Sequence, residues 1–362
     1  MNLKPPEQTL HERFEPLRRA LTTGPLADRV AEARVVVLPG SEPPWTDTGI
    51  SLESGDEITV LAAGRIVLSE ELDLWFGPRV YLWRRIGEQG PVFRATRETA
   101  THCADRAGTL QLGIYPGAWT TRNGEHEGAG GLAGALGALL IRWRGDGVEG
   151  VRALASACPE DLLVRAELER LEHPVIRPAH WEPLWYLGET DLFTAAEVDG
   201  RSVIRAHPEN EAAIVKRAVD TDLTPETRLT WSWRIDELPS KAAENTLPTH
   251  DYISIAVEFD NGQDLTWYWS AALPEETVFR CPLPWWDQRE THIAIRSGTA
   301  GLGRWSTETR NLYADYEKAL GKPPARIVGV WLIAVSFFTH GRGAADFADI
   351  ALEQPGRRIA LD

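Results

Sequence analysis

Two tryptophan-rich segments alternate large apolar residues with smaller or polar ones. Residues 229–235 read LTWSWRI and residues 265–270 read LTWYWS. Because side chains at positions i and i+2 of a β-strand point to the same face, each tryptophan pair shares its face with Leu or Ile. If the paired indoles pointed to solvent, they could form a surface on which a flat ligand stacks. Because they share their face with Leu and Ile, we expect them in the core instead. The tryptophans expected to point inward are Trp231, Trp233, Trp267 and Trp269.

The same alternation recurs along most of the chain, in short runs separated by Gly, Pro, Asp and Asn. A first group of runs reads RVVVLP, EITVLAAG, RIVL, VYLWRRI, TLQLGIY and ALLIRW, ending near Trp143. A second group reads SVIRAHP, AAIVKRAV, LTWSWRI, DYISIAVEF, DLTWYWS, THIAIRSG, RIVGVWLIAVSFF and DFADIALE. This spacing is typical of antiparallel sandwiches, so the pattern predicts an all-β protein with two tandem β-sandwiches.

Helical periodicity interrupts the strands at three places. Residues 7–20 have an apolar stripe typical of a short amphipathic helix. The GDGVEG segment marks a boundary, after which Pro159 and two acids begin a helix that runs to about His173. A third helix is predicted over residues 306–320. We therefore divide the chain into a helical arm (1–32), a β-sandwich (33–148), a helical linker (149–180) and a second sandwich (181–362).

Composition excludes several functional classes. The chain has 362 residues and a net charge of −15, which disfavours nucleic acids and anionic membranes because both require basic patches. No apolar run approaches the length of a membrane span, and the charged N-terminus has no apolar signal segment, so we expect a cytoplasmic protein. The three cysteines lack the spacing of a disulfide framework or a zinc site, and the histidines are scattered. We expect no cofactor, apart from the calcium considered below, and the oligomeric state stays open.

Polar side chains on the opposite face of the second-sandwich strands are candidates for ligand binding. The period of two places Arg234, Tyr252, Glu258, Tyr268 and Arg296 away from the tryptophan face, on strands that we expect to be neighbours. Tyr and Arg can stack on rings and donate hydrogen bonds, as a polyhydroxylated ligand requires. An ordinary solvated face is the alternative interpretation.

The segment CPLPWWDQRE, residues 281–290, offers a second binding surface. Its prolines favour an extended backbone, in which the adjacent Trp285 and Trp286 cannot both point inward. We expect at least one of these indoles at the surface or at the rim of a pocket, where it could stack on a sugar ring or another flat apolar group.

Residues 34–143 resemble the galactophilic bacterial lectins typified by the PA-I lectin, on the phrases PPWTDTGISLESGDEITVLAAGRI, RRIGEQGPVF and GTLQLGIY. The resemblance implies a galactose-binding-like β-sandwich that holds a sugar through calcium. The loop that supplies the calcium ligands in those lectins departs from their pattern here, because Gly117 stands near the expected Asp. Asn123, Glu125 and Glu127 are the candidate calcium ligands that remain.

Residues 185–353 resemble domain-of-unknown-function family 3047, on the ordered phrases WSWR, HDYISIAVEF, YWS, IRSG, GRWSTETRN and DFADIAL. The resemblance implies a jelly-roll of the carbohydrate-binding type. The family's usual Asp-Asp-Tyr is His250-Asp251-Tyr252 here, and its polar Asp/Asn-rich loop is replaced by a segment with Phe337, Phe338 and His340. Whatever the family does with that loop, we expect this chain to have altered it.

These observations favour a protein that binds a glycan or a related polar small molecule as its ligand. A cofactor-independent cyclase or isomerase of natural-product biosynthesis with an aromatic-lined cavity is the first alternative, and a glycoside hydrolase is the second. No phosphate-binding loop, GxSxG or HExxH motif is present, so whether the chain is an enzyme stays open. Candidate catalytic residues are Asp251, Glu258 and His340, although Asp251 and Glu258 are seven positions apart and fall on opposite faces of a regular strand.

Overall fold

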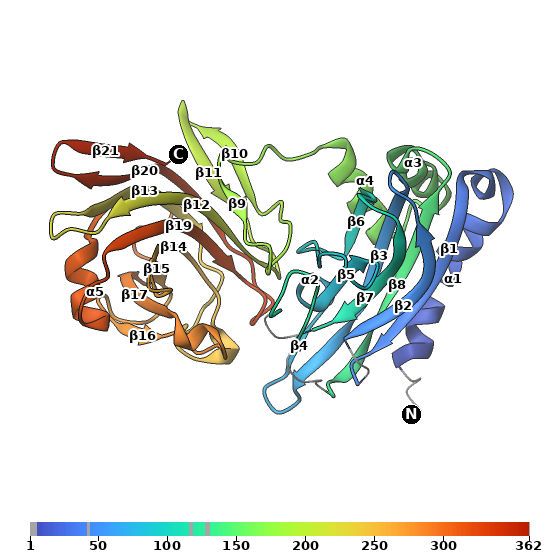
Figure 1. Ribbon diagram of the computed structural model, residues 1–362, viewed down its shortest axis with the longest axis horizontal. Helices are drawn as coiled ribbons and strands as arrows, with labels where there is room; N and C mark the ends of the chain where they lie inside the picture. The colour runs from blue at the N-terminus through green and yellow to red at the C-terminus, as the bar shows by residue number, and fades with distance from the viewer. Residues whose placement is uncertain (1–5, 42–43, 116–118, 127–130, 362) are drawn as a thin grey trace. The chain divides into compact units, whose positions relative to one another are not determined.

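The computed structural model describes residues 6–41, 44–115, 119–126 and 131–361. The chain divides into two compact units, residues 1–174 and 175–362. Each unit is built mainly of antiparallel β-sheets arranged as a sandwich, which confirms the predicted fold class (Figure 1). None of the described helices combines the length and the apolar character needed to cross a lipid bilayer.

The described strands of the first unit form two sheets. One sheet has the order β1-β8-β3-β4, with β6 also paired to β3. Its strands are β1 (Val30–Pro39), β8 (Ala133–Trp143), β3 (Glu57–Ser69), β4 (Leu74–Phe76) and β6 (Thr99–Cys103). The other sheet has the order β2-β7-β5, formed by β2 (Trp45–Leu52), β7 (Gly108–Ile114) and β5 (Leu82–Ile86).

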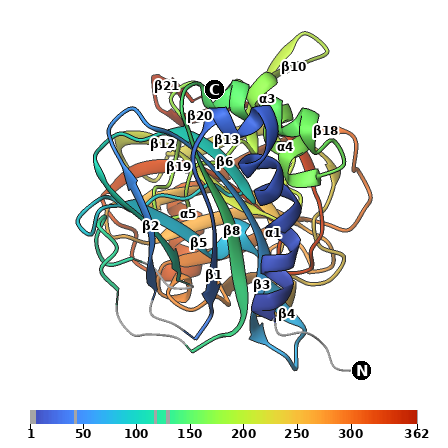
Figure 2. The same cartoon turned by 90° about the vertical axis from the view of Figure 1, so that its right-hand side faces the viewer.

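Helices cover the larger of these sheets. The N-terminal helix α1 (Pro6–Thr22) lies along β1 and β8 and buries Phe14, Leu17 and Leu21 there (Figure 2). The helices α3 (Gly147–Ala157) and α4 (Leu162–Glu172) contribute Val151, Leu154 and Val164 to the same core. Residues 149–174 of the predicted helical linker (149–180) therefore belong to the first unit, and residues 175–180 to the second. Two short helices complete the described set, η1 (Gly24–Arg29) and α2 (Pro78–Tyr81).

The second unit also contains two sheets. A six-stranded sheet has the order β10-β11-β20-β13-β18, with β21 paired to β20. It comprises β10 (Phe193–Val198), β11 (Arg201–Ala206), β20 (Ala344–Gln354), β13 (Arg228–Glu237), β18 (Trp305–Asn311) and β21 (Arg357–Ala360). A seven-stranded sheet has the order β16-β17-β15-β14-β19-β12-β9. It comprises β16 (Val278–Arg280), β17 (Glu290–Ser297), β15 (Asp264–Ser270), β14 (Tyr252–Phe259), β19 (Arg326–Val335), β12 (Ala212–Asp222) and β9 (Glu182–Pro183).

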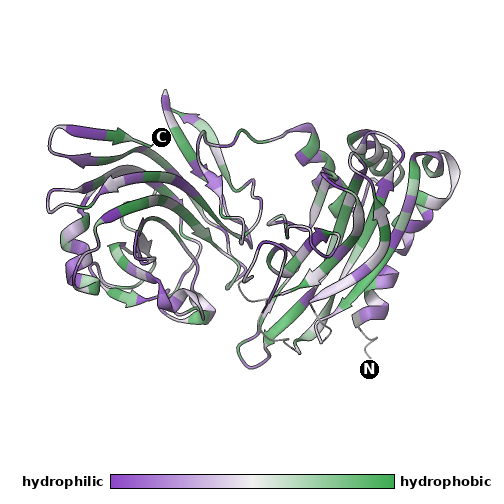
Figure 3. Ribbon diagram, in the orientation of Figure 1, coloured by the Kyte–Doolittle hydropathy of each residue, from purple (hydrophilic) through white to green (hydrophobic). Residues whose placement is uncertain are grey.

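The core of the second unit confirms the predicted direction of the paired tryptophans. Trp231 and Trp233 on β13 and Trp267 and Trp269 on β15 all belong to one buried apolar cluster. The ring centroids of Trp231 and Trp267 are 6.4 Å apart, and those of Trp233 and Trp269 are 6.0 Å apart. Apolar and polar residues are interspersed along the strands, as Figure 3 shows by colour. The paired indoles are therefore core residues that join the two sheets.

One predicted helix begins later than expected. Residues 306–311 form most of β18, and α5 (Leu312–Leu320) follows, so the first part of the expected helix is a strand. Asn311 separates the two elements because its side-chain Oδ1 accepts a hydrogen bond from the amide of Ala314, at 2.9 Å. Two short helices, η2 (Leu247–Thr249) and η3 (Trp286–Gln288), lie in the loops that flank the seven-stranded sheet.

Candidate functional site

The face of the seven-stranded sheet that points away from the tryptophan core carries a dense set of polar side chains. The strand register aligns Ser254 with Tyr268 and Thr266 with His292 across β14, β15 and β17. These four residues are fully buried, and Tyr252 on the same face is 4 % exposed. Loops therefore cover this face, and the expectation that Tyr252 and Tyr268 are exposed is wrong.

One covering loop follows β13 and is fixed by Glu244. The Glu244 carboxylate accepts hydrogen bonds from the hydroxyl of Ser270 at 2.5 Å and from the amide of Ala271 at 2.6 Å. Its Oε2 also lies 3.5 Å from the hydroxyl of Tyr268. Burial, with a smaller contribution from Glu244, raises the pKa of Tyr268 far above its usual value. Tyr268 is consequently a neutral phenol that donates a long hydrogen bond to the loop after β13.

Two of the predicted ligand-binding residues are not on this face. Arg234 lies on β13, in the other sheet, where it pairs with Asp346 at 2.8 Å and lies over the ring of Trp305. Arg296 lies on β17, but a register shift brings it level with Trp269 instead of Tyr268. It therefore points toward the opposite sheet and pairs with Glu308 at 2.8 Å. The five predicted residues do not form one surface.

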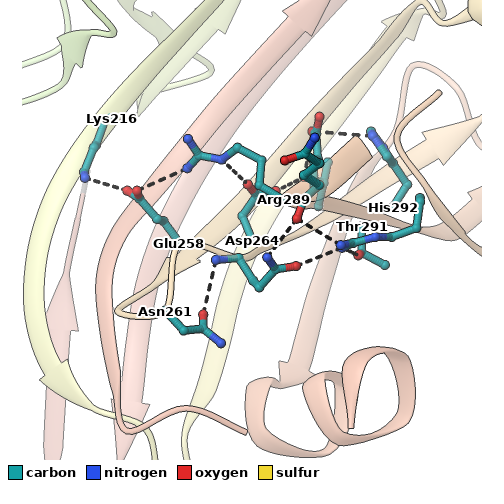
Figure 4. Close-up of polar contacts among 12 residues, drawn as sticks. Lys216, Glu258, Asn261, Asp264, Arg289, Thr291 and His292 are labelled. Atoms are coloured by element: carbon teal, nitrogen blue, oxygen red, sulfur yellow. Dashed lines mark hydrogen bonds and ion pairs between the residues drawn. The ribbon is translucent and has the colours of Figure 1, made fainter. Parts of the chain in front are cut away.

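Three carboxylates form a row across the sheet at the other end of these strands. The register places Glu258 opposite Asp264 and Asp264 opposite Glu290. Arg289 contacts Glu258 and Asp264, each at 3.3 Å, and Lys216 pairs with Glu258 at 2.5 Å (Figure 4). Two cations thus neutralise the outer part of the row.

The pKa values of the two inner carboxyl groups of the row, Asp264 and Glu290, are shifted in opposite directions. Burial raises the pKa of Asp264 well above its usual value, and the neighbouring Glu290 adds to this effect. Burial also disfavours the charged form of Glu290, but the combined effects of His292, His250 and Cys281 lower the Glu290 pKa to about 2. Glu290 accepts hydrogen bonds from Tyr252 and Thr266, both at 3.1 Å. The two carboxyl groups therefore titrate as a coupled pair.

Aromatic side chains surround Arg289 and form what we call the aromatic cluster: Tyr186, Trp285, Trp286 and Trp331. The Arg289 guanidinium lies 5.6 Å from the ring centroids of Trp285 and Trp286 and 5.0 Å from that of Trp331. Tyr186 meets Trp285 edge-on at 5.8 Å, and burial raises the pKa of its hydroxyl to about 12. Trp331 is buried, Trp286 is half-buried and Trp285 is 41 % exposed. The expectation that at least one of the adjacent indoles lies at the surface is confirmed.

A second cluster, which the sequence analysis missed, lies on the same sheet face. His250, Cys281 and His292 are all buried, and one potential ligand atom from each lies within 4.8 Å of the others. Burial raises the pKa of the Cys281 thiol far above its usual value, and burial lowers that of His250 to about 3. Both groups are therefore neutral in the metal-free protein. The residues are 31 and 11 positions apart in the chain, and no metal-binding motif has that spacing.

The three catalytic candidates are not assembled into an active site. Both oxygens of Asp251 are bound to the loop after β19, through the amides of Phe338 and Thr339 and the hydroxyl of Thr339. Glu258 lies seven residues along the strand, about 20 Å away at the rise of a β-strand. His340 is exposed, and its Nδ1 lies 2.9 Å from Asn210. Asp251 thus anchors a loop, and it does not pair with Glu258.

Two of the three candidate calcium ligands can be placed. The Asn123 side chain donates to Gln89 at 3.1 Å and accepts from Thr121. Glu125 is exposed, and Glu127 lies outside the described residues. Calcium binding by this loop stays a prediction.

Comparison with known proteins finds one family match, within the second unit. Residues 179–351 match the family described as Protein of unknown function (DUF3047). This match confirms the resemblance of the C-terminal half. No protein with a curated description matches the chain.

Several solved structures are similar to parts of the chain. The N-terminal domain of EclA, a PllA-like lectin, is 19% identical over 32% of this chain and 98% of its own, with a TM-score of 0.25. The xyloglucanase domain of NopAA from Sinorhizobium fredii is 10% identical over 44% of this chain and 92% of its own, with a TM-score of 0.28. The family 30 carbohydrate-binding module of Cel9D-Cel44B from Clostridium thermocellum is 11% identical over 51% of this chain and 96% of its own, with a TM-score of 0.30. Similarity at this level assigns no function, and the lectin resemblance of the first unit stays a prediction.

Proposed function

We propose that the second unit binds a carbohydrate, or a related polyhydroxylated small molecule, at the aromatic cluster. The observation that carries this proposal is the exposure of Trp285. A tryptophan that is 41 % exposed places a large apolar ring against water, although the chain buries many other indoles. An exposed indole is suited to stack on the apolar C–H face of a sugar ring.

The backbone holds Trp285 in a defined position. Its φ angle of 73° lies in the left-handed region, which a residue with a bulky side chain rarely adopts. The ring is packed edge-on against Trp286, with centroids 5.0 Å apart, and against Tyr186. An indole held in this way loses little conformational entropy when a ligand stacks on it.

Polar groups next to the indoles can satisfy the hydroxyl groups of such a ligand. Lys216, Glu258 and Arg289 are partly exposed, with side-chain exposures of 28%, 17% and 18%. They supply both donors and an acceptor, as a polyol requires. The arrangement of stacking ring and charged hydrogen-bonding groups therefore favours a polar cyclic ligand over a purely apolar one.

Binding to a glycan array, followed by calorimetry with the best ligand, tests this proposal. We expect Trp285→Ala to weaken binding at least about tenfold, which corresponds to about 1.4 kcal/mol. The Tm should change little because the ring is already partly in water. Ile176→Ala, which removes another exposed apolar side chain of the same unit, is the matched control and should leave the affinity unchanged.

The structure also distinguishes the two adjacent indoles. Trp286 is half-buried and contacts both Trp331 and Arg289, so Trp286→Ala should lower the Tm as well as the affinity. Equal affinities of Trp285→Ala and the unmodified protein for the selected glycan would contradict the proposal. The proposal would also be contradicted if the unmodified protein bound no glycan on the array.

A further inference from the structure

The His250, Cys281 and His292 side chains come from three separate parts of the second unit. His250 follows η2 and directly precedes Asp251 and β14, Cys281 directly follows β16, and His292 lies within β17. The pairing of Phe279 with His292 across β16 and β17 brings Cys281 beside the sheet. All three side chains are at most 1 % exposed. Nitrogen and sulfur atoms of three residues thus meet in a place without solvent.

The orientation of His250 is that of a metal ligand. Its Nδ1 lies 2.5 Å from the backbone carbonyl oxygen of Glu244, so this nitrogen carries the proton and donates it. The lone pair is therefore on Nε2, which lies 3.3 Å from the sulfur of Cys281. Histidines that bind metals commonly donate their second ring N–H to a backbone carbonyl or a carboxylate, because that bond fixes the tautomer and the ring orientation.

His292 is an independent indication that a partner belongs in this cluster. Neither of its ring nitrogens makes a hydrogen bond, although the side chain is fully buried. Its Nε2 lies 3.5 Å from Oε1 of Glu290, in a geometry that does not give a hydrogen bond. The ring is stacked on Phe279 with centroids 5.0 Å apart and an angle of 8°, so it is held in place. A buried imidazole whose ring nitrogens make no hydrogen bond costs free energy that a metal ion would recover.

We propose that His250, Cys281 and His292 bind a thiophilic divalent metal ion, with Zn²⁺ as the natural occupant. Nitrogen and sulfur ligands of a tetrahedral Zn²⁺ ion are about 3.5 Å apart, given bond lengths of about 2.1 and 2.3 Å. The separation of 3.3 Å between His250 Nε2 and Cys281 Sγ fits this value. The widest ligand pair, within 4.8 Å, closes by about 1 Å when the ion binds.

Charge balance supports the same ion. A thiolate, two neutral imidazoles and Zn²⁺ carry a net charge of +1, which is costly in a buried site. Glu290 lies beside His292, where a carboxylate would supply the missing negative charge, and its hydrogen bonds from Tyr252 and Thr266 keep it in place. Because no ligand atom reaches solvent, we assign the ion a structural role, in which the three side chains supply three of the four positions of a tetrahedral ion. It ties the loop before β14 and the end of β16 to β17, and this role is separate from ligand binding at the aromatic cluster.

Metal analysis of the full-length chain tests the proposal. We expect zinc to copurify at about one ion per chain, and its removal by a chelator to lower the Tm. Protein produced in cobalt-supplemented medium should show a thiolate-to-cobalt charge-transfer band and the visible absorption of a tetrahedral Co²⁺ site. Incorporation during synthesis avoids the slow passage of metal into a buried site.

Variants assign the ligands. Cys281→Ser and His292→Gln should lower the zinc content by about 10-fold or more. The double variant Cys103→Ala/Cys158→Ala leaves Cys281 as the one cysteine and should keep both the zinc and the charge-transfer band. If Cys281→Ser does not fold, the charge-transfer band of this double variant shows whether Cys281 is the thiolate ligand. Unmodified protein with neither zinc nor the cobalt band would overturn the proposal, as would full zinc content in Cys281→Ser.

Discussion

At the residue scale, alternation along a strand predicts the direction of a side chain but not its partner. The period of two was sufficient to place the paired indoles inward, because only the local geometry of a strand is required. Three of the four also donate a hydrogen bond that the sequence does not reveal. Trp233 donates to Glu308, Trp267 to Asp315 and Trp269 to the carbonyl of Gly298. The ring N–H of Trp231 has no such partner.

This difference leads to a prediction for two equally buried tryptophans. Trp231→Phe should reduce the free energy of unfolding by about 1–2 kcal/mol, through lost packing. Trp267→Phe should cost about 1–2 kcal/mol more, because its ring N–H donates to the buried Asp315 at 3.0 Å. Urea unfolding followed by circular dichroism measures both values. A larger loss in Trp231→Phe than in Trp267→Phe would show that packing, and not the hydrogen bond, dominates.

The clusters that carry the proposals differ in how far the sequence could predict them. An extended backbone at Trp285 and Trp286 predicted that one of the two indoles is exposed. Trp285 is exposed, but the backbone is not extended there, because the Trp285 φ angle is 73° and Trp286 begins η3. The His250, Cys281 and His292 set depends on the pairing of β16 with β17 and on the path of a loop. No local pattern encodes those long-range contacts, and the spacing of cysteines alone argued against a zinc site.

At the element scale, most strands were predictable, and the errors occur where one element ends. Residues 306–311 read STETRN, in which Ser and Thr alternate with charged residues, and β18 uses that alternation to pair with β13. The helical prediction extended α5 backward through Asn311, although Asn is a favoured residue at the start of a helix. On β17, the register shift reversed the direction of Arg296, since one extra residue moves every later side chain to the other face.

The attachment of α5 and β18 to the loop before β16 depends on one carboxylate. Glu276 pairs with Arg310 on β18 at 2.7 Å and with Lys318 on α5 at 3.0 Å. Its hydrogen bond from Arg310, partly opposed by burial and assisted by Lys318, lowers the Glu276 pKa from 4.5 to about 2. Because the folded-state pKa is depressed, the stabilisation is present above the usual pKa and is lost as the pH falls from about 4.5 toward 2.

We therefore expect Glu276→Gln to reduce the free energy of unfolding at pH 7 by about 0.5–1 kcal/mol, the range for partly exposed ion pairs. The difference between the variant and the unmodified protein should shrink toward zero as the pH falls to about 2. Urea unfolding at several pH values measures it. Glu226→Gln, which changes another exposed glutamate of the same unit, is the matched control. A deficit in Glu276→Gln that stays constant with pH would contradict the assignment.

At the scale of the whole molecule, a list of strands does not say which strands share a sheet. β13 and β15 carry near-identical phrases, yet β13 pairs with β18 and β20 while β15 pairs with β14 and β17. The expected polar surface from Arg234 to Arg296 assumed a single sheet, and the sandwich divides those residues between two. Sheet membership is set by the packing of the shared core between the sheets, which depends on the full sequence of the unit.

The separate cores of the two units predict that each unit folds alone. The buried cluster around Phe14, Leu139 and Trp143 lies within residues 1–174, and the cluster around the paired indoles lies within residues 175–362. Both units are long enough to bury a core of their own. We expect fragments 1–174 and 175–362 each to unfold cooperatively in urea, with transitions that match two phases of the 362-residue chain.

A fragment ending at residue 148 lacks most of α3 and all of α4, whose Val151, Leu154 and Val164 complete the first core, so it should be less stable than fragment 1–174. Equal stability of these two fragments would instead support a helical linker outside the first sandwich.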